Sequence, residues 1–300
     1  KLMPSMKYLP CSLELFLCCL EQQTSIAQTT ESPVRSYIGF EDIGVAQPKW
    51  EYGLAAGVID TPNYPSSSER NFTPLALPYF IYRGDTFRIG EEGARAVVVE
   101  DNKFELDLSI DGALPADTDN NSLRDGMTEL DFLFEVGPQL IYRLRDVNFT
   151  KGGKGRLNLR LQLRSVFSTN FESIDSRGYV FEPEISYQQR NVLFINTALD
   201  ASLSLVFASD KLQDYFYGVP PEFVTTDRAA FDASSGYLGA ELSAGISIPI
   251  YDNIRGFAGG SINFHHGAAN QDSPLFEKDV TYSIGIGFVW RVGKSVLLAK

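Results

Sequence analysis

Between residues 156 and 164 the chain alternates strictly between apolar and polar side chains. Leucine stands at positions 157, 159, 161 and 163, and arginine, asparagine or glutamine stands between them. Successive side chains of a β-strand point to opposite faces, so this segment predicts a strand with one apolar and one polar face. The same period of two recurs along the chain, in residues 104–111, 179–188, 193–207, 238–250 and 281–291.

The length of these alternating segments indicates where the strands lie. Several exceed ten residues, whereas strands of globular proteins are typically about five or six residues long and a tilted strand that crosses a bilayer needs about nine to eleven. No stretch approaches the roughly eighteen apolar residues of a transmembrane helix. The pattern therefore favours a transmembrane β-barrel, because alternation hides its hydrophobicity from an overall composition of 44% hydrophobic residues.

The number of strands follows from the connections. Single-chain outer-membrane barrels have an even number of antiparallel strands, with short periplasmic turns and longer outer loops. We place strands at 50–60, 74–82, 104–110, 128–145, 155–168, 178–189, 192–208, 235–250, 254–267 and 280–292, and outer loops at 61–71, 111–127, 209–234 and 268–279.

The segment 86–100 decides the total. A hairpin broken near 91–93 gives twelve strands, whereas one continuous strand gives an odd number and reverses the assignment of inside and outside. A soluble twelve-stranded sandwich is the alternative fold. An open sheet of twelve long strands would expose two edges, whereas closure into a barrel removes them. We expect the hairpin, and hence an all-β, closed, antiparallel transmembrane barrel of about twelve strands.

The amino-terminal residues have the composition of an export signal. Lys1 and Lys7 precede an apolar run at 11–20, and small residues at 25 and 27 suit a signal peptidase. We expect residues 1–27 to be a cleaved signal peptide, 28–49 a periplasmic lead-in, 50–292 the barrel and 293–300 a tail. The three cysteines all fall within the signal, so the mature chain has neither a disulfide framework nor a cysteine metal site.

The net charge of −12 and the isoelectric point near 4.7 exclude one class of partner. Phosphate binding requires a basic surface, so nucleic acid is not expected to bind. An acidic, cysteine-free mature chain is typical of an exported bacterial protein.

Six short motifs resemble the MipA/OmpV family of outer-membrane proteins, which is named for a scaffolding protein that contacts a lytic transglycosylase. They are WEYGLAAGV at 50–58, PNY at 62–64, LPYFIYRGD at 77–85, LRDGM at 123–127, YFYGV at 215–219 and DSP at 272–274. Members of the family usually end on an aromatic residue, whereas residues 293–300 follow the last strand pattern here.

The resemblance implies a Gram-negative outer-membrane barrel without enzyme activity, cofactor or metal. It also implies a structural or scaffolding role, with membrane lipid, a lytic transglycosylase and a peptidoglycan synthase as partners. The periplasmic contact would then use residues 28–48, 145–155 or the tail after Val292. A narrow solute channel and a surface adhesin are the alternatives.

The histidines bear on the enzyme alternative. His265 and His266 are adjacent on a predicted strand, so their side chains point to opposite faces and do not form a metal-binding pair. An outer-leaflet lipid or glycan hydrolase would use His266 with Ser261 or Ser273 and Asp272. Nothing in the sequence distinguishes such a triad, so we expect no catalytic residues.

Charged residues on the polar strand faces are candidates for the barrel lumen. They are Glu105, Asp107, Glu129, Asp131, Arg160, Arg164, Glu182, Glu184, Asp200 and Glu241. Two interpretations stand: a pore that selects solutes by charge, or a filled lumen in which these groups pair with each other. A barrel of twelve strands encloses a modest interior, which favours the filled lumen.

The longest loop, 208–234, is rich in aromatic residues. Tyr215, Phe216, Tyr217 and Phe223 form a candidate outer surface. Exposed aromatic side chains are unfavourable unless they fold inward or meet a partner. The loop is therefore expected either to plug the barrel mouth or to capture a ligand or partner.

Overall fold

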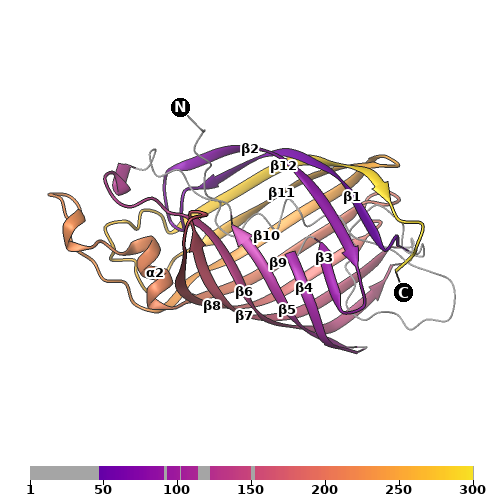
Figure 1. The fold of residues 1–300 in the computed structure, drawn as a ribbon, viewed down its shortest axis with the longest axis horizontal. Coiled ribbons are helices and arrows are strands. Elements are labelled where there is room, and N and C mark those ends of the chain that lie inside the picture. The colour runs from indigo at the N-terminus through magenta and orange to yellow at the C-terminus, as the bar shows by residue number, and fades with distance from the viewer. Residues whose placement is uncertain (1–46, 91–92, 102, 114–121, 150–152, 300) are drawn as a thin grey trace.

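A computed structural model describes residues 47–90, 93–101, 103–113, 122–149 and 153–299. These residues form a closed antiparallel barrel of twelve strands (Figure 1), as the alternation predicted. The strands are β1 (Trp50–Pro62), β2 (Arg70–Arg83), β3 (Phe87–Gly90), β4 (Gly93–Glu100), β5 (Phe104–Ala113), β6 (Phe132–Asn148), β7 (Lys154–Thr169), β8 (Ile174–Arg190), β9 (Ala198–Ala208), β10 (Gly236–Tyr251), β11 (Ile254–Phe264) and β12 (Val280–Lys294). Each strand pairs with the next in sequence, and β12 closes the ring on β1.

Strand β7 shows why the chain forms a barrel in lipid. Its polar residues, such as Arg160 and Arg164, are buried inside, while Leu163 on the opposite face is exposed. This is the reverse of a water-soluble protein, in which large apolar side chains are buried. The soluble-sandwich alternative is therefore wrong.

The hairpin that decides the strand number is present. β3 and β4 pair with each other, with Arg88 opposite Arg95, and two undescribed residues lie between them. The prediction of a break near 91–93 is confirmed, and with it the even number of strands.

Several predicted boundaries are wrong. β2 begins at Arg70, so the outer connection before it shortens to 63–69. β6 begins at Phe132 and not at 128. β9 begins at Ala198 and not at 192, because residues 191–197 form a turn in which the Thr197 hydroxyl donates to the Phe194 carbonyl (2.7 Å).

The side-chain direction that the alternation predicts for Leu238 is wrong because of a β-bulge. The sequence pattern placed this side chain on the lipid face with Leu242, but it is inward and 8% exposed. The β9–β10 register shifts between Tyr237 and Gly239. An inserted residue reverses the facing of the side chains on one side of it, which period-two reasoning does not detect.

The barrel has two distinct ends. The outer end has the long connections, which contain η2 (Ser122–Arg124), α2 (Asp210–Tyr217) and η3 (Pro221–Phe223), and α2 lies at the left in Figure 1. At the inner end the tail is paired, since Pro48 bridges Leu298 and the Lys49 N–H donates to the Leu297 carbonyl (2.7 Å). In the described part of the chain no helix is long and apolar enough to cross a membrane. The predicted signal peptide and residues 28–46 of the lead-in lie outside the described residues.

Candidate functional site

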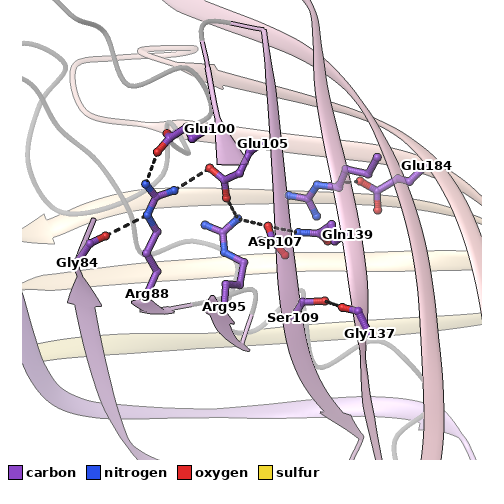
Figure 2. A network of polar contacts seen from close by, with 11 residues as sticks. Gly84, Arg88, Arg95, Glu100, Glu105, Asp107, Ser109, Gly137, Gln139 and Glu184 are labelled. Atoms are coloured by element: carbon purple, nitrogen blue, oxygen red, sulfur yellow. Dashed lines mark hydrogen bonds and ion pairs between the residues drawn. The ribbon is translucent and has the colours of Figure 1, made fainter. Parts of the chain in front are cut away.

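The barrel lumen contains a network of ion pairs on the inner faces of β3, β4 and β5 (Figure 2). Arg88 lies 2.6 Å from the carboxylate of Glu100 and 2.7 Å from that of Glu105. Arg95 lies 3.2 Å from Glu105 and 3.6 Å from Asp107. Glu105 is fully buried between the two arginines, as a buried charge requires, because an isolated one would be too costly to desolvate.

The network continues along the neighbouring strands. Gln139 of β6 donates to Asp107 (3.2 Å). On β7, Arg164 lies 3.1 Å from Glu135 of β6 and 2.9 Å from Glu182 of β8.

Strand register explains these contacts. Arg160 of β7 is directly opposite Glu184 of β8, and the two side chains lie 3.6 Å apart. Because direct cross-strand partners share a face, opposite charges in register meet inside the barrel. Inward-facing side chains of neighbouring strands therefore form ion pairs or hydrogen bonds with each other from β3 to β8.

The predicted lumen charges are not all in the lumen. Eight of the ten belong to inward faces of described strands: Glu105, Asp107, Arg160, Arg164, Glu182, Glu184, Asp200 and Glu241. Glu129 and Asp131 instead precede β6 in the outer connection, where Glu129 is exposed and Asp131 lies 3.8 Å from Arg177. Placing them on a strand was wrong, because the strand begins three residues after Glu129.

Sequence reasoning missed several members of the network. Arg88 and Arg95 were not singled out, although they occupy inward positions on either side of the predicted hairpin break. Glu51 was also missed, and it joins Arg83 (2.5 Å) to Arg291 (2.9 Å) near the inner end. The signal for Arg88 and Arg95 was the alternation within 86–100, which becomes readable once the hairpin is accepted.

The outer end is covered by a cluster of apolar side chains from the outer connections and the adjoining strand ends, which we call the outer cap. Its buried members are Tyr64, Leu130, Leu133, Val166, Val180, Ala208, Leu212, Tyr217, Val219, Leu238 and Leu275. Tyr217 is fully buried and its hydroxyl donates to the Pro65 carbonyl (3.1 Å), while the Tyr64 hydroxyl donates to the Leu275 carbonyl (2.7 Å). Burial raises the pKa of both phenols, so they stay neutral.

Polar side chains tie the cap segments together. Arg124 donates to the Phe216 carbonyl (2.9 Å), and Asn270 donates to the side chain of Gln213 (2.7 Å). Burial lowers the pKa of Arg124. These contacts connect the β5–β6, β9–β10 and β11–β12 connections into one unit.

The aromatic loop residues lie at different depths in this cap. Tyr217 is buried, whereas Tyr215, Phe216 and Phe223 are half-buried. Tyr217 therefore faces other cap residues and not solvent. Capture of a ligand or partner by this loop stays a prediction.

The two histidines differ in environment. His265 is buried beneath the cap, where Nε2 accepts the Ser66 N–H (3.2 Å) and lies 3.0 Å from the Thr281 hydroxyl, and Nδ1 lies 3.3 Å from the Leu238 carbonyl. Facing a carbonyl, Nδ1 carries the proton. His266 is exposed.

The two serines of the hydrolase alternative lie in different places. The Ser273 hydroxyl donates to the Tyr217 carbonyl (2.7 Å), and Ser261 is buried on the lumen face of β11. Among the described residues, no group of three or more histidine, cysteine, aspartate or glutamate side chains is arranged to hold a metal ion.

Comparison with known proteins identifies the family. The model of the family described as "MltA-interacting protein MipA" matches residues 54–292. The chain belongs to the MipA family. The match runs from β1 into β12, so it covers the barrel, and the resemblance inferred from the short motifs is confirmed.

Other comparisons add little. No curated protein matches this chain. A solved structure described as a bacterial polysaccharide outer membrane secretin aligns with 81% of this chain and 99% of its own, at 7% identity and a TM-score of 0.34. At that distance it carries no argument about function.

Proposed function

We propose that this protein is a non-catalytic barrel of the Gram-negative outer membrane, exported by a cleaved signal, that holds a periplasmic lytic transglycosylase at the membrane. The family description names an interacting protein and no reaction, which supports a binding role. Through the transglycosylase, the barrel would also bring a peptidoglycan synthase to the same place.

The observation that carries this proposal concerns the lumen and the outer end of the barrel, both of which a channel would need to keep open. The lumen charges from β3 to β8 pair with each other, and the outer cap covers the outer end. A conducting pore needs charges that are available to solutes and an open mouth. This arrangement favours a structural or docking role over conduction.

Exposed apolar residues at the inner end are the surface that we assign to the partner. Leu193, Phe194 and Ile195 in the β8–β9 turn are each more than half exposed. So are Val296, Leu297 and Leu298 after β12. Exposed apolar groups of this kind are typical of protein interfaces.

The test is binding of a purified lytic transglycosylase of the type named by the family to the barrel in lipid nanodiscs. Replacing Leu193, Phe194 and Ile195 by serine, or residues 296–298 by serine, is expected to weaken binding about tenfold or more, as loss of interface anchors does. Phe171→Ser is the matched control, since Phe171 is exposed in the outer β7–β8 turn. Equal binding by all variants, or none by the wild type, would refute the proposal.

Planar-bilayer recording tests whether the barrel conducts ions, as the channel alternative requires. We expect no steady conductance from the purified barrel. Steady, charge-selective steps would favour the channel alternative instead.

A further inference from the structure

Within the described residues, most of β2 has no hydrogen-bonded strand on the side away from β1. β2 pairs with β1 along its whole length. It pairs with β3 only at Tyr82 and Arg83, and within the described chain nothing pairs with residues 70–81 on that side. Figure 1 shows how short β3 is beside its neighbours. Among the described strands, the ring closes at the inner end and leaves this edge of β2 without a partner towards the outer end, and we call it the bare edge.

Backbone hydrogen bonds show which β2 residues face the bare side. At one end of the β1–β2 pair the Arg83 N–H donates to the Lys49 carbonyl (2.8 Å), and at the other the Asn63 N–H donates to the Glu69 carbonyl (3.0 Å). The register between them has no shift. Since alternate residues of an antiparallel strand bond to the same neighbour, odd-numbered residues of β2 bond to β1. Even-numbered residues direct their N–H and carbonyl groups to the bare side.

Two of these even positions are prolines, Pro74 and Pro78. Proline has no N–H, so the edge lacks two donors that an added strand would need. This argues against a strand from a partner or from a second copy of the chain. A bare edge also cannot face hydrocarbon, where each unsatisfied backbone group is costly, so it must line an opening that holds polar groups.

The inner face beside this edge has an exposed apolar surface. Leu77 is directly opposite Ala55, which is opposite Val289, so the three share the lumen face. Ala55 and Val289 are 4% and 0% exposed, whereas Leu77 is 36% exposed. Leu77 is therefore accessible because of its place at the bare edge.

Uncharged polar atoms without partners lie farther along the same face, towards the outer end. The Thr61 hydroxyl, the Asn71 amide nitrogen and the Thr73 hydroxyl make no hydrogen bond within the described chain. Thr61 and Asn71 are direct cross-strand partners and are 0% and 5% exposed. Buried polar groups normally have partners, so a cluster without them indicates a missing ligand.

We propose that the opening beside β2 is a lateral binding site for an amphiphile with an alkyl chain and an uncharged polar head, which enters from the membrane. Thr61, Asn71 and Thr73 bind the head near the outer end. The alkyl chain lies inside the lumen against Leu77, which at the rise of a β-strand is about 13 Å along β2 from Thr73 and about 20 Å from Asn71. Charged heads are disfavoured because Arg70, the arginine adjacent to Asn71, is already engaged by the carboxylate of Asp60 (2.7 Å). This site is independent of the partner surface at the inner end.

Fluorescence quenching tests the proposal in the full-length mature barrel in bilayers. Both tryptophans, Trp50 and Trp290, are replaced by phenylalanine, and one reporter is added. Leu77→Trp reports on the opening, Phe80→Trp on the lipid face of the same strand, and Phe257→Trp on the lumen face of β11, where Phe257 is 5% exposed. The probe is dodecyl maltoside brominated in its alkyl chain.

We expect the probe to quench Leu77→Trp at least half as strongly as Phe80→Trp, and Phe257→Trp hardly at all. Adding Asn71→Leu and Thr73→Val should remove the quenching at Leu77→Trp and leave that at Phe80→Trp unchanged. A brominated fatty acid anion at the same mole fraction should quench Leu77→Trp less than the maltoside.

Three results would overturn the proposal. The first is Leu77→Trp quenched no more than Phe257→Trp. The second is quenching by aqueous acrylamide but not by the brominated chain, which would indicate a lumen filled only with water. The third is quenching that appears only after residues 28–46 are deleted, which would indicate that the chain's own lead-in occupies the opening.

Discussion

The inward charges from β3 to β8 and the uncharged inward groups at the outer end of β1 and β2 lie in one barrel but differ in whether they have partners. Among the first set, Arg164 lies between Glu135 and Glu182, and Glu105 between two arginines. Among the second set, the Thr61 hydroxyl and the Asn71 amide nitrogen have no hydrogen-bond partner in the described chain. A buried charge without a partner costs several kcal/mol, whereas an unpaired uncharged group costs about 1–3 kcal/mol. The uncharged groups are therefore the less costly ones to leave without a partner.

The largest expected effect is on the inward charges. Glu105→Gln removes the buried charge that two half-buried arginines share, and breaking a buried pair destabilises by about 3–5 kcal/mol. Glu100→Gln is the matched control, because Glu100 is partly exposed and contacts Arg88 from the end of β4. Urea unfolding of the refolded barrel in vesicles measures both. Equal losses would mean that burial of Glu105 does not set its importance.

The next effect tests the bare edge of β2. Leu75→Pro removes an N–H that the β2 alternation directs to β1, and we expect a loss of about 1–3 kcal/mol because a β1 carbonyl loses its donor. Ala76→Pro changes the neighbouring residue, whose N–H faces the bare side, and should cost little. The same unfolding assay compares them. A large loss from Ala76→Pro would show that this edge is paired and would remove the lateral opening.

A smaller effect is expected in the outer cap. Tyr217→Phe deletes the hydroxyl that donates to the Pro65 carbonyl and should destabilise the cap by about 1 kcal/mol. Hydrogen exchange of the outer connections measures it. Tyr251→Phe at the inner end, where Tyr251 is exposed, is the control and should change nothing.

The smallest expected effect is a pH dependence of the stability of the outer cap. Burial lowers the pKa of His265 below its ordinary value of 6.5, against the opposing influence of Asp279. The opened cap then binds a proton more readily than the closed one, so cap stability is full above pH 6.5 and falls as the pH drops below it. Exchange rates at pH 5 and pH 7.5 test this. The difference should vanish in His265→Gln and persist in His266→Gln, and its persistence in His265→Gln would assign it to another group.

Local alternation was sufficient to predict much of the fold. It determined which side of β7 faces lipid, because the facing of a strand residue depends only on its neighbours in the chain. Parity then required the hairpin at 86–100, since a single-chain outer-membrane barrel has an even number of strands. The motifs that resemble the MipA/OmpV family were also readable without coordinates, and the family match confirms them.

The tertiary structure decided what depends on register and on contacts between distant segments. The bulge between Tyr237 and Gly239 directs the Leu238 side chain into the outer cap, and a bulge is defined only by the pairing of β10 with β9. The late start of β6 removes Glu129 from the lumen. Likewise, Pro74 and Pro78 became informative only once the hydrogen bonds showed which side of β2 they face and the pairing showed no described strand on that side. A sequence specifies which face each residue takes along a strand, but whether anything lies beside that strand is a property of the assembled barrel.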